Sequence, residues 1–229
     1  FMLHNFLLMS LHWTDLLQPQ WYINHGGLFL LLFVVFAETG LFAGFFLPGD
    51  SLLFVAGIYS NKLAQWLYDW NNDFLNLMMI VILVTICGIL GNIVGYWFGK
   101  KSGPALYKRK DSFFFKQRYL RQASDFYEEN GGFTIIVARF VPFVRTFAPI
   151  VAGIVKMDYA KFMWYNIVGC VAWSFSMIGA GHYLHKFFLS HYQFDLTEHL
   201  EIIVLGIVFI TTLPVFIKVL KHRKSKHHE

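Results

Sequence analysis

The feature that most constrains this chain is a run of 26 residues without a charged side chain, from Phe74 to Gly99. An α-helix rises about 1.5 Å per residue, so this run makes a helix about 39 Å long. The hydrocarbon core of a bilayer is about 30 Å thick, and about 20 apolar residues cross it. Only 14% of all residues are charged, against about 25% in an ordinary soluble domain. The sequence therefore predicts a membrane-spanning helix over 74–99.

Two further apolar segments have the composition of spans. Residues 162–186 contain no Asp, Glu, Lys or Arg before Lys186, and residues 201–220 are apolar between Glu201 and Lys218. A lysine near the end of a span reaches the interface with its alkyl stem, so Lys218 is compatible with a span. The fold class expected is an all-α integral membrane protein with a single membrane domain over 1–229.

The first 20 residues suit a helix that lies on the membrane surface. Apolar residues are interspersed there with His4, Asn5, His12 and Asp15, which makes the segment too polar for a span. No Lys or Arg occurs among the first 17 residues, so the positive start of a secretory signal is missing. We expect an amphipathic N-terminal helix over 1–20.

Two other apolar segments, 26–58 and 133–155, are interrupted by residues that break helices. Proline lacks the backbone N–H and clashes with the preceding turn, and glycine permits a sharp reversal. Irregular backbone at membrane depth is tolerated only where protein or water satisfies its polar groups. Each segment is therefore predicted to be a re-entrant helical hairpin that enters and leaves on one side. The residues expected to break the helices are Pro48, Gly49, Pro142, Pro149 and Gly153.

The order of a hairpin followed by a span occurs twice, and short sequence matches accompany it. Val-Ala-Gly-Ile at 55–58 recurs at 151–154, and Gly-Tyr-Trp-Phe-Gly-Lys at 95–100 resembles Gly-His-Tyr-Leu-His-Lys at 181–186. Short matches between apolar segments arise easily by chance, but these two occur in the same order. The pattern predicts an inverted repeat, an organisation common among secondary transporters.

The distribution of positive charge predicts the orientation in the membrane. The first 61 residues contain no Lys or Arg, whereas residues 100–121 contain eight and the tail 221–229 is also basic. Cytoplasmic loops of membrane proteins are enriched in these residues. The basic linker 100–130 and the C-terminal tail are therefore predicted to be cytoplasmic, with one hairpin entering from each face.

Four charged residues lie inside the two broken segments: Glu38, Asp50, Arg139 and Arg145. Each costs about 2.5–3.5 kcal/mol at the centre of an inserted helix on insertion scales. Two acids and two bases suggest that they pair across facing hairpins around a wet cavity. Two interpretations remain open: the charges only lock the hairpins together, or they also bind a substrate and exchange protons.

Arginine and carboxylate side chains in one cavity suit anion binding coupled to proton exchange. The planar guanidinium matches two phosphate oxygens at once, and a carboxylate exchanges protons as its surroundings change. Polar and aromatic residues on the spans are candidates for lining the cavity, although such residues more often bond neighbouring helices. These candidates are Asn92, Tyr96, Asn166 and Trp173.

Motifs of other function classes are missing from the sequence. It contains no GxSxG, Walker A or zinc-ligand spacing and no visible nucleophile–base pair. The chain is therefore expected not to be an enzyme, to need no cofactor or metal and to bind no nucleic acid; the basic linker suits anionic lipid headgroups. His182 and His185, near the end of a predicted span, are expected to anchor it at the interface.

Two long motifs resemble the signatures of the DedA family, within the VTT (SNARE-associated) superfamily. The first is Glu-Thr-Gly at 38–40 followed by Phe-Leu-Pro-Gly-Asp-Ser-Leu-Leu-Phe-Val-Ala-Gly at 46–57. The second is Arg-Phe-Val-Pro-Phe-Val-Arg-Thr-Phe-Ala-Pro-Ile-Val-Ala-Gly at 139–153. The stretches 91–96 and 165–173 are also similar to the family, so the resemblance covers roughly residues 20–190.

The resemblance implies a multi-pass protein of the bacterial inner membrane, in one superfamily with eukaryotic lipid scramblases. Family members are associated with recycling of undecaprenyl phosphate, with the proton motive force and with envelope integrity. The functional acids and arginines of the family correspond to Glu38, Asp50, Arg139 and Arg145. The expected function is translocation of undecaprenyl phosphate or a related anionic lipid, with protons as possible coupling ions. The alternative is a small-solute or ion transporter driven by the proton motive force.

Overall fold

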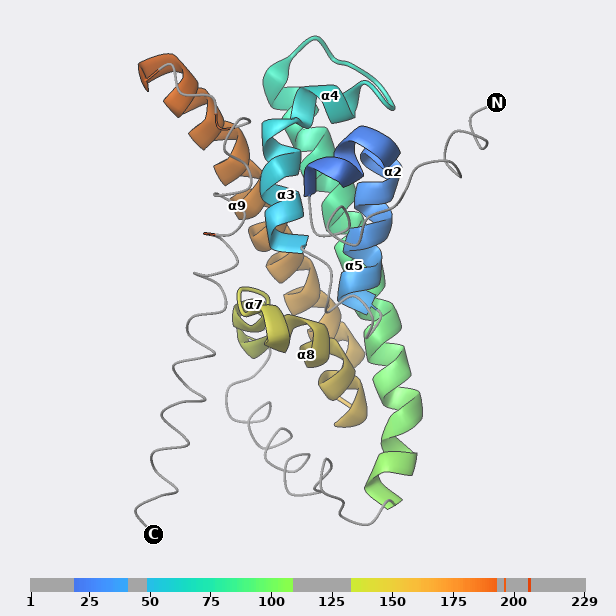
Figure 1. Cartoon of the computed structure of the whole chain (residues 1–229). Coiled ribbons are helices and arrows are strands. Elements are labelled where there is room, and N and C mark those ends of the chain that lie inside the picture. The colour runs from blue at the N-terminus through green and yellow to red at the C-terminus, as the bar shows by residue number, and fades with distance from the viewer. Residues whose placement is uncertain (1–18, 41–48, 109–132, 193–195, 197–205, 207–229) are drawn as a thin grey trace, which may run out of the picture.

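A computed structural model of the chain describes residues 19–40, 49–108, 133–192, 196 and 206 (Figure 1). Seven α-helices and no strand occur in this part of the chain, which agrees with the predicted all-α class. Several predicted segments lie wholly or mostly outside the described residues. They are the surface helix 1–20, the basic linker beyond residue 108, the span 201–220 and the tail 221–229.

Two long helices contain the predicted spans 74–99 and 162–186. Helix α5 runs over Asp73–Lys108 and helix α9 over Tyr159–Tyr192. Both are long and apolar enough to cross a membrane. They pack against each other and run in opposite directions (Figure 1). The start of α5 and the end of α9 thus lie at one end of the molecule, here called the α4 end. The opposite end is called the linker end.

Both long helices extend beyond the uncharged runs, and polar side chains cap their starts. Asn72 Oδ1 accepts backbone N–H groups at the start of α5, at 3.0 and 3.2 Å. Asp158 Oδ1 accepts the N–H of Lys161 at 2.9 Å at the start of α9. The first N–H groups of a helix have no partner within the helix, so such oxygens stabilise its start. The uncharged run sets the hydrocarbon-spanning part, and the caps fix where each helix starts.

The first broken segment forms two helices on either side of residues 41–48. Helix α2 runs over Pro19–Gly40 and helix α3 over Gly49–Ile58, followed by the short helix α4 over Ser60–Ala64. Helix α2 is kinked at Gly27, whose φ of 53° favours glycine. A Cβ at Gly27 would lie 2.2 Å from the ring of Trp66, so this position also lacks space for a side chain. The predicted helix breaker Pro48 lies outside the described residues.

The second broken segment forms helix α7 over Phe133–Ala138 and helix α8 over Pro142–Ile154. The break falls at 139–141, and Pro142 is the first residue of α8, where its missing N–H costs nothing. Pro149 and Gly153 were also predicted to break the helix, but both lie inside α8. Pro149 is tolerated because α8 is packed against α5. Gly153 provides space for a neighbouring backbone.

The second helix of each broken segment packs on the long helix from the other half of the sequence: α3 lies against α9, and α8 lies against α5. We call this arrangement crosswise packing. Glycines make both contacts possible. A Cβ on Gly57 would lie 2.0 Å from the carbonyl oxygen of Ile178 in α9, and a Cβ on Gly153 would lie 2.0 Å from that of Tyr96 in α5. Gly57 and Gly153 occupy the same place in the repeated sequence Val-Ala-Gly-Ile. Both pairs of helices therefore meet backbone to backbone.

Large apolar side chains cover the outside of the long helices. Ile82 is 57% exposed and Trp164 is 66% exposed, and other apolar residues such as Val94, Val171 and Phe175 are exposed as well. The larger cluster of buried apolar residues in the described part of the chain includes Leu31, Leu52, Val84 and Trp173, on α2, α3, α5 and α9. A soluble protein rarely exposes so continuous an apolar surface, and a membrane protein faces lipid with it.

Candidate functional site

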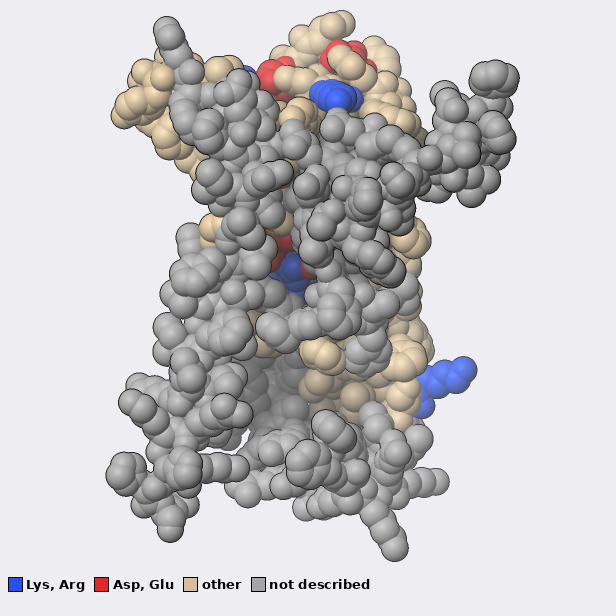
Figure 2. Space-filling view, in the orientation of Figure 1, with Lys and Arg blue, Asp and Glu red and all other residues tan. Residues whose placement is uncertain are grey.

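A buried ion cluster lies where the two broken segments meet the long helices. Arg145 of α8 donates from Nη2 to Oε1 of Glu38 in α2 and from Nη1 to Oδ1 of Asp50 in α3. Arg145 and Glu38 are buried, and Asp50 is 15% exposed. Figure 2 shows acidic and basic atoms together at mid-height, with the other charged atoms of the described surface nearer its two ends. One arginine thus holds three helices together at this level.

Glycines around Glu38 leave the space that its carboxylate occupies. A Cβ on Gly49, the first residue of α3, would lie 1.4 Å from Oε2 of Glu38. Gly40 of α2 and Gly91 of α5 also meet closely, because a Cβ on Gly40 would lie 2.8 Å from the carbonyl oxygen of Gly91. Gly49, predicted only as a helix breaker, therefore also admits a buried carboxylate.

Trp173 of α9 connects all parts of the ion cluster. Its indole Nε1 donates to Oδ1 of Asp50 at 2.9 Å. The guanidinium carbon of Arg145 lies 5.1 Å from the indole ring centre, and that of Arg139 lies 5.6 Å from it. These distances allow a cation–π attraction to both arginines, which strengthens where water is excluded. The ring thus contacts both guanidinium groups, and its N–H fixes Asp50.

Arg139 has a different environment from Arg145. It is 3% exposed, and its Nη2 donates to the amide oxygen of Asn166 at 3.1 Å. The same oxygen accepts a hydrogen bond from Asn92 Nδ2. No carboxylate among the described residues forms an ion pair with Arg139, and its Nε has no hydrogen-bond partner there. A buried guanidinium held only by a neutral amide remains able to attract an anion.

The structure brings the four predicted charges together, but not as two separate pairs. Both acids contact Arg145, and Arg139 contacts asparagine. Of the predicted lining residues, Asn92, Asn166 and Trp173 belong to this cluster. Tyr96 does not: its hydroxyl donates to the carbonyl of Met157 at 2.7 Å, and its ring stacks on Phe162 towards the linker end.

Sequence reasoning missed a second polar cluster, at the α4 end. Ser60 Oγ lies 3.0 Å from His182 Nδ1, and His182 Nε2 lies 2.9 Å from Asp73 Oδ2, which also binds Lys186. His182 is therefore buried, in contrast to its predicted place at the interface. The order serine, histidine, aspartate resembles a nucleophile–base chain. Ser60 is completely buried, however, so this chain lacks an accessible nucleophile and joins α4, α5 and α9 instead.

The loop before α5 is held by asparagine and aspartate side chains. Asn76 Nδ2 donates to Asp69 Oδ1 at 2.9 Å and to Asn61 Oδ1 at 3.0 Å. The hydrogen bonds from Asn76 and from the backbone of Asn71 hold the pKa of Asp69 below its usual value. Among the described residues, no three His, Cys, Asp or Glu side chains are placed to hold a metal ion.

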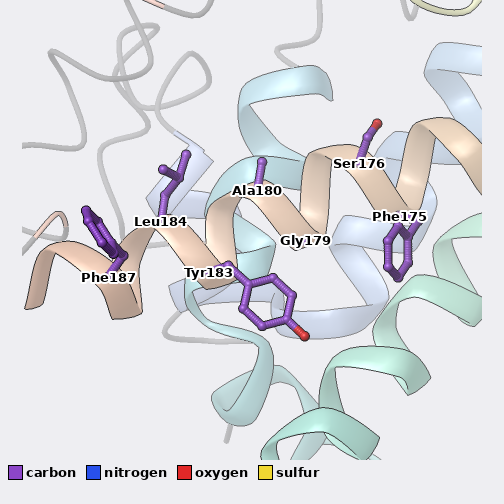
Figure 3. Close-up of a pocket in the computed structure, with 7 residues that line it drawn as sticks. All are labelled: Phe175, Ser176, Gly179, Ala180, Tyr183, Leu184 and Phe187. Carbon is purple, nitrogen blue, oxygen red and sulfur yellow. The ribbon is translucent and has the colours of Figure 1, made fainter. Parts of the chain in front are cut away.

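One cavity in the described part of the chain is apolar and separate from the ion cluster. It has a volume of about 640 Å³ and follows α9 on its outer face (Figure 3). Figure 3 shows Phe175 and Tyr183 to one side of the helix and Leu184 to the other. The lining residues are Phe175, Ser176, Gly179, Ala180, Tyr183, Leu184 and Phe187. This surface offers hydrocarbon contacts and few hydrogen bonds.

Comparison with known proteins identifies the family. Residues 29–183 match the VTT domain. The chain is 38% identical over 196 residues to protein DedA of Escherichia coli K12, which covers 86% of this chain and 83% of that protein. It is 36% identical over 207 residues to a membrane protein of Mycobacterium leprae, covering 88% and 86% of the two chains. It is 28% identical over 183 residues to inner membrane protein YqjA of E. coli, covering 76% and 79%. No solved structure matches. The chain belongs to the DedA family of VTT-domain membrane proteins.

Proposed function

We propose that this protein translocates an anionic lipid, undecaprenyl phosphate or a related lipid phosphate, across the bacterial inner membrane. The observation that carries the proposal is the buried guanidinium of Arg139. It lies beside an arginine already engaged by two carboxylates, and its own partner is a neutral amide. A phosphate monoester supplies the charge and the paired oxygens that such a guanidinium binds best.

The charges of the ion cluster favour coupling to protons. Glu38 and Asp50 balance Arg139 and Arg145, so the empty cluster is neutral. A bound phosphate adds negative charge, which is costly in a medium of low dielectric constant. Uptake of a proton by either carboxylate would offset the charge of a phosphate bound as its monoanion and would weaken one hydrogen bond of Arg145. Binding of the anion and binding of a proton would then favour each other.

The fold supports the proposal of two re-entrant hairpins in an inverted repeat. Helices α3 and α8 begin next to the ion cluster and run to opposite ends of the molecule, where Gly57 and Gly153 meet the long helices. Each hairpin would then open the cluster to one side of the membrane. This is the alternating-access geometry of transporters built from inverted repeats.

Accessibility of the two ends tests the proposed orientation. With Cys87 and Cys170 replaced, a cysteine at Asn71 should react with an impermeant thiol reagent added to intact cells. A cysteine at Lys101 should react only after the membrane is permeabilised, because Lys101 begins the basic, cytoplasmic linker. Both positions are exposed, so burial does not protect either one. Labelling of both positions from the same side would contradict a crossing by α5.

The apolar cavity on α9 favours a lipid over a soluble anion as the substrate. A lipid phosphate brings a hydrocarbon tail that must stay in apolar surroundings while its headgroup crosses. The cavity runs from Phe175 to Phe187 along the outer face of α9, whereas Trp173 of the ion cluster is buried on the inner side of the same helix. Its surface is formed by aromatic and small residues, which suit an alkyl or isoprenoid chain.

Reconstitution tests the function directly. In liposomes with a fluorescent polyprenyl phosphate, the wild-type protein should accelerate exchange between leaflets, measured by chemical quenching of the outer leaflet. Arg139→Lys keeps the charge but loses the planar fork, so the rate per folded molecule should fall about 10- to 100-fold, as expected for one or more charged hydrogen bonds. Glu38→Gln and Asp50→Asn should abolish the dependence of the rate on a proton gradient.

The matched control removes a positive charge outside the cluster. Lys161→Gln changes an exposed lysine at the start of α9 and should leave the rate unchanged. If wild-type protein does not exceed protein-free liposomes, lipid translocation is excluded. Dissipation of a pH gradient by added Na⁺ or K⁺ under the same conditions would then indicate the alternative function, ion transport.

A further inference from the structure

The side-chain amide of Asn166 is the hydrogen-bond partner of Arg139. Asn166 lies on α9 and is completely buried. Its oxygen accepts hydrogen bonds from Asn92 Nδ2, from Arg139 Nη2 at 3.1 Å and from Cys170 Sγ at 3.4 Å. Its Nδ2 faces the carbonyl oxygen of Ile89 at 3.4 Å. Three donors on one side and an acceptor on the other fix which amide atom is the oxygen.

An aspartate would have the same shape as this asparagine and would act differently. A buried carboxylate beside Arg139 would form a charged hydrogen bond and neutralise the guanidinium. Arg145 shows this outcome, because both of its hydrogen bonds go to carboxylates. The amide of Asn166 instead orients the guanidinium and leaves its positive charge uncompensated at close range.

Two glycines near Arg139 make room for its guanidinium, and one of its N–H groups remains available to a ligand. Gly88 of α5 and Gly169 of α9 lie on either side of it: a Cβ on Gly169 would lie 3.1 Å from Arg139 Cδ, and a Cβ on Gly88 would lie 3.7 Å from Nη1. Arg139 Nε is buried without a hydrogen-bond partner among the described residues, as is Arg145 Nε, but only Arg139 also has no described carboxylate on its terminal nitrogens. A buried N–H donor without a partner is costly, and an anion would remove that cost.

We infer that Asn166, held by Asn92, is the residue that sets the charge of the anion site: it reserves Arg139 for a phosphate monoester, while Arg145 stays bound to its two carboxylates. This inference rests on the proposed function. It assigns anion binding to Arg139 and binding of the two carboxylates to Arg145. Asn166 acts through Arg139 and is a positioning residue. Its neutrality matters more than its ability to accept a hydrogen bond.

The substitution Asn166→Asp tests the inference with almost no change in shape. Purified protein in a maltoside detergent is titrated with dodecyl phosphate, a monoester, and with dodecylphosphocholine, whose headgroup has no net charge. Wild-type protein should prefer the monoester. In Asn166→Asp, affinity for the monoester should fall about 10- to 100-fold, the equivalent of one charged hydrogen bond, and the preference should disappear. The new carboxylate gains a charged hydrogen bond from Arg139 but places an acceptor against the carbonyl oxygen of Ile89, so the unfolding temperature of the unliganded protein should change little.

Two further variants separate charge from structure. Asn166→Leu removes the hydrogen bond without adding charge, so affinity should fall while the preference for the monoester remains. Asn76→Asp changes a buried asparagine of α5 at the α4 end. It places a carboxylate next to Asp69 and should lower stability without changing affinity per folded molecule. If Asn166→Asp does not fold, Asn92→Asp is the alternative. It introduces the same charge on the residue that bonds Asn166, the hydrogen-bond partner of Arg139, and should also abolish the preference.

The outcomes distinguish the inference from the proposed function. If wild-type protein binds both amphiphiles equally, the proposal of a lipid-phosphate site fails. If wild-type protein prefers the monoester and the folded aspartate variants keep that preference, only the role of Asn166 is overturned. A loss of preference in Asn166→Leu equal to that in Asn166→Asp would also overturn it, because hydrogen bonding and not charge would then be the determinant.

Discussion

Arg145→Gln is expected to prevent the protein from accumulating in the membrane. Arg145 is the cation that both buried carboxylates, Glu38 and Asp50, bind in the described structure. Removing one partner of a buried ion pair costs about 3–5 kcal/mol, because the remaining charge stays buried without compensation. A cost of this size is comparable to the total stability of many domains. The yield of monodisperse protein after detergent extraction measures the effect.

Arg139→Gln is the matched control for this prediction. It removes the same side chain from the same cluster, but no described carboxylate loses an ion pair. This variant should accumulate normally and lose lipid-phosphate binding. Replacing Glu38, Asp50 and Arg145 together by Gln, Asn and Gln should restore part of the accumulation, because no buried carboxylate is then left without Arg145, while Arg139 keeps its amide partner Asn166. Equal yields for Arg145→Gln and Arg139→Gln would contradict the difference between the two arginines.

Gly57→Val is expected to have the second largest effect. The added Cβ would lie 2.0 Å from the carbonyl oxygen of Ile178 and 3.0 Å from the amide nitrogen of His182. Backbone atoms of a helix cannot turn away as a side chain can, so α3 must separate from α9. The cost should reach or exceed about 3 kcal/mol, the upper part of the usual range for overpacking. A lower unfolding temperature in detergent and a lower yield would show it.

Gly179→Ala provides the control on α9. No atom of the described residues lies within 4 Å of a Cβ at Gly179, so the substitution should change stability by less than about 0.5 kcal/mol. Gly153→Val, at the equivalent contact of α8 with α5, should resemble Gly57→Val. A fully stable Gly57→Val protein would show that the contact between α3 and α9 is looser than described.

The identity of the ion cluster could be predicted from the sequence, but its pairing could not. Glu38, Asp50, Arg139 and Arg145 are recognisable because a charge inside an apolar segment is costly and must be compensated. Which acid meets which arginine depends on the register of four helices, and no local pattern encodes that register. Asn92 and Asn166 were predicted as lining residues, but their contacts with each other and with Arg139 were not, since these residues are 74 and 27 positions apart in the respective pairs.

Helix breaks were predicted where proline occurs, although proline interrupts a helix only in some positions. Pro142 begins α8, and Pro149 lies within it. The propensity of the residue is the same in both places, and packing against α5 decides between them. The polar cluster of Ser60, Asp73 and His182 could not be predicted either, because His182 is 122 residues from Ser60 and 109 residues from Asp73.

The two sequence matches differ in how they relate to the contacts. Under the proposed repeat, Gly57 and Gly153 correspond, as the match predicted. Gly57 contacts Ile178 and Gly153 contacts Tyr96, so the contacts make Ile178 and Tyr96 equivalent positions of the repeat. The match of 95–100 with 181–186 relates His182 to Tyr96 instead, four residues or about one helical turn further on. Aromatic and glycine residues recur at several turns of a span, so a sequence match alone does not fix the turn.

The crosswise packing of α3 on α9 and of α8 on α5 has a consequence for biosynthesis. When the end of α5 leaves the ribosome, α8 and α9 do not yet exist, and the 84 residues up to the end of α9 take about 4–17 s to synthesise at about 5–20 residues per second. During this time Glu38 and Asp50 have no arginine, and the glycine surfaces of α3 and α5 face lipid or an insertion factor. The first half is thus an unfinished intermediate, open to membrane proteases until translation of the second half is complete.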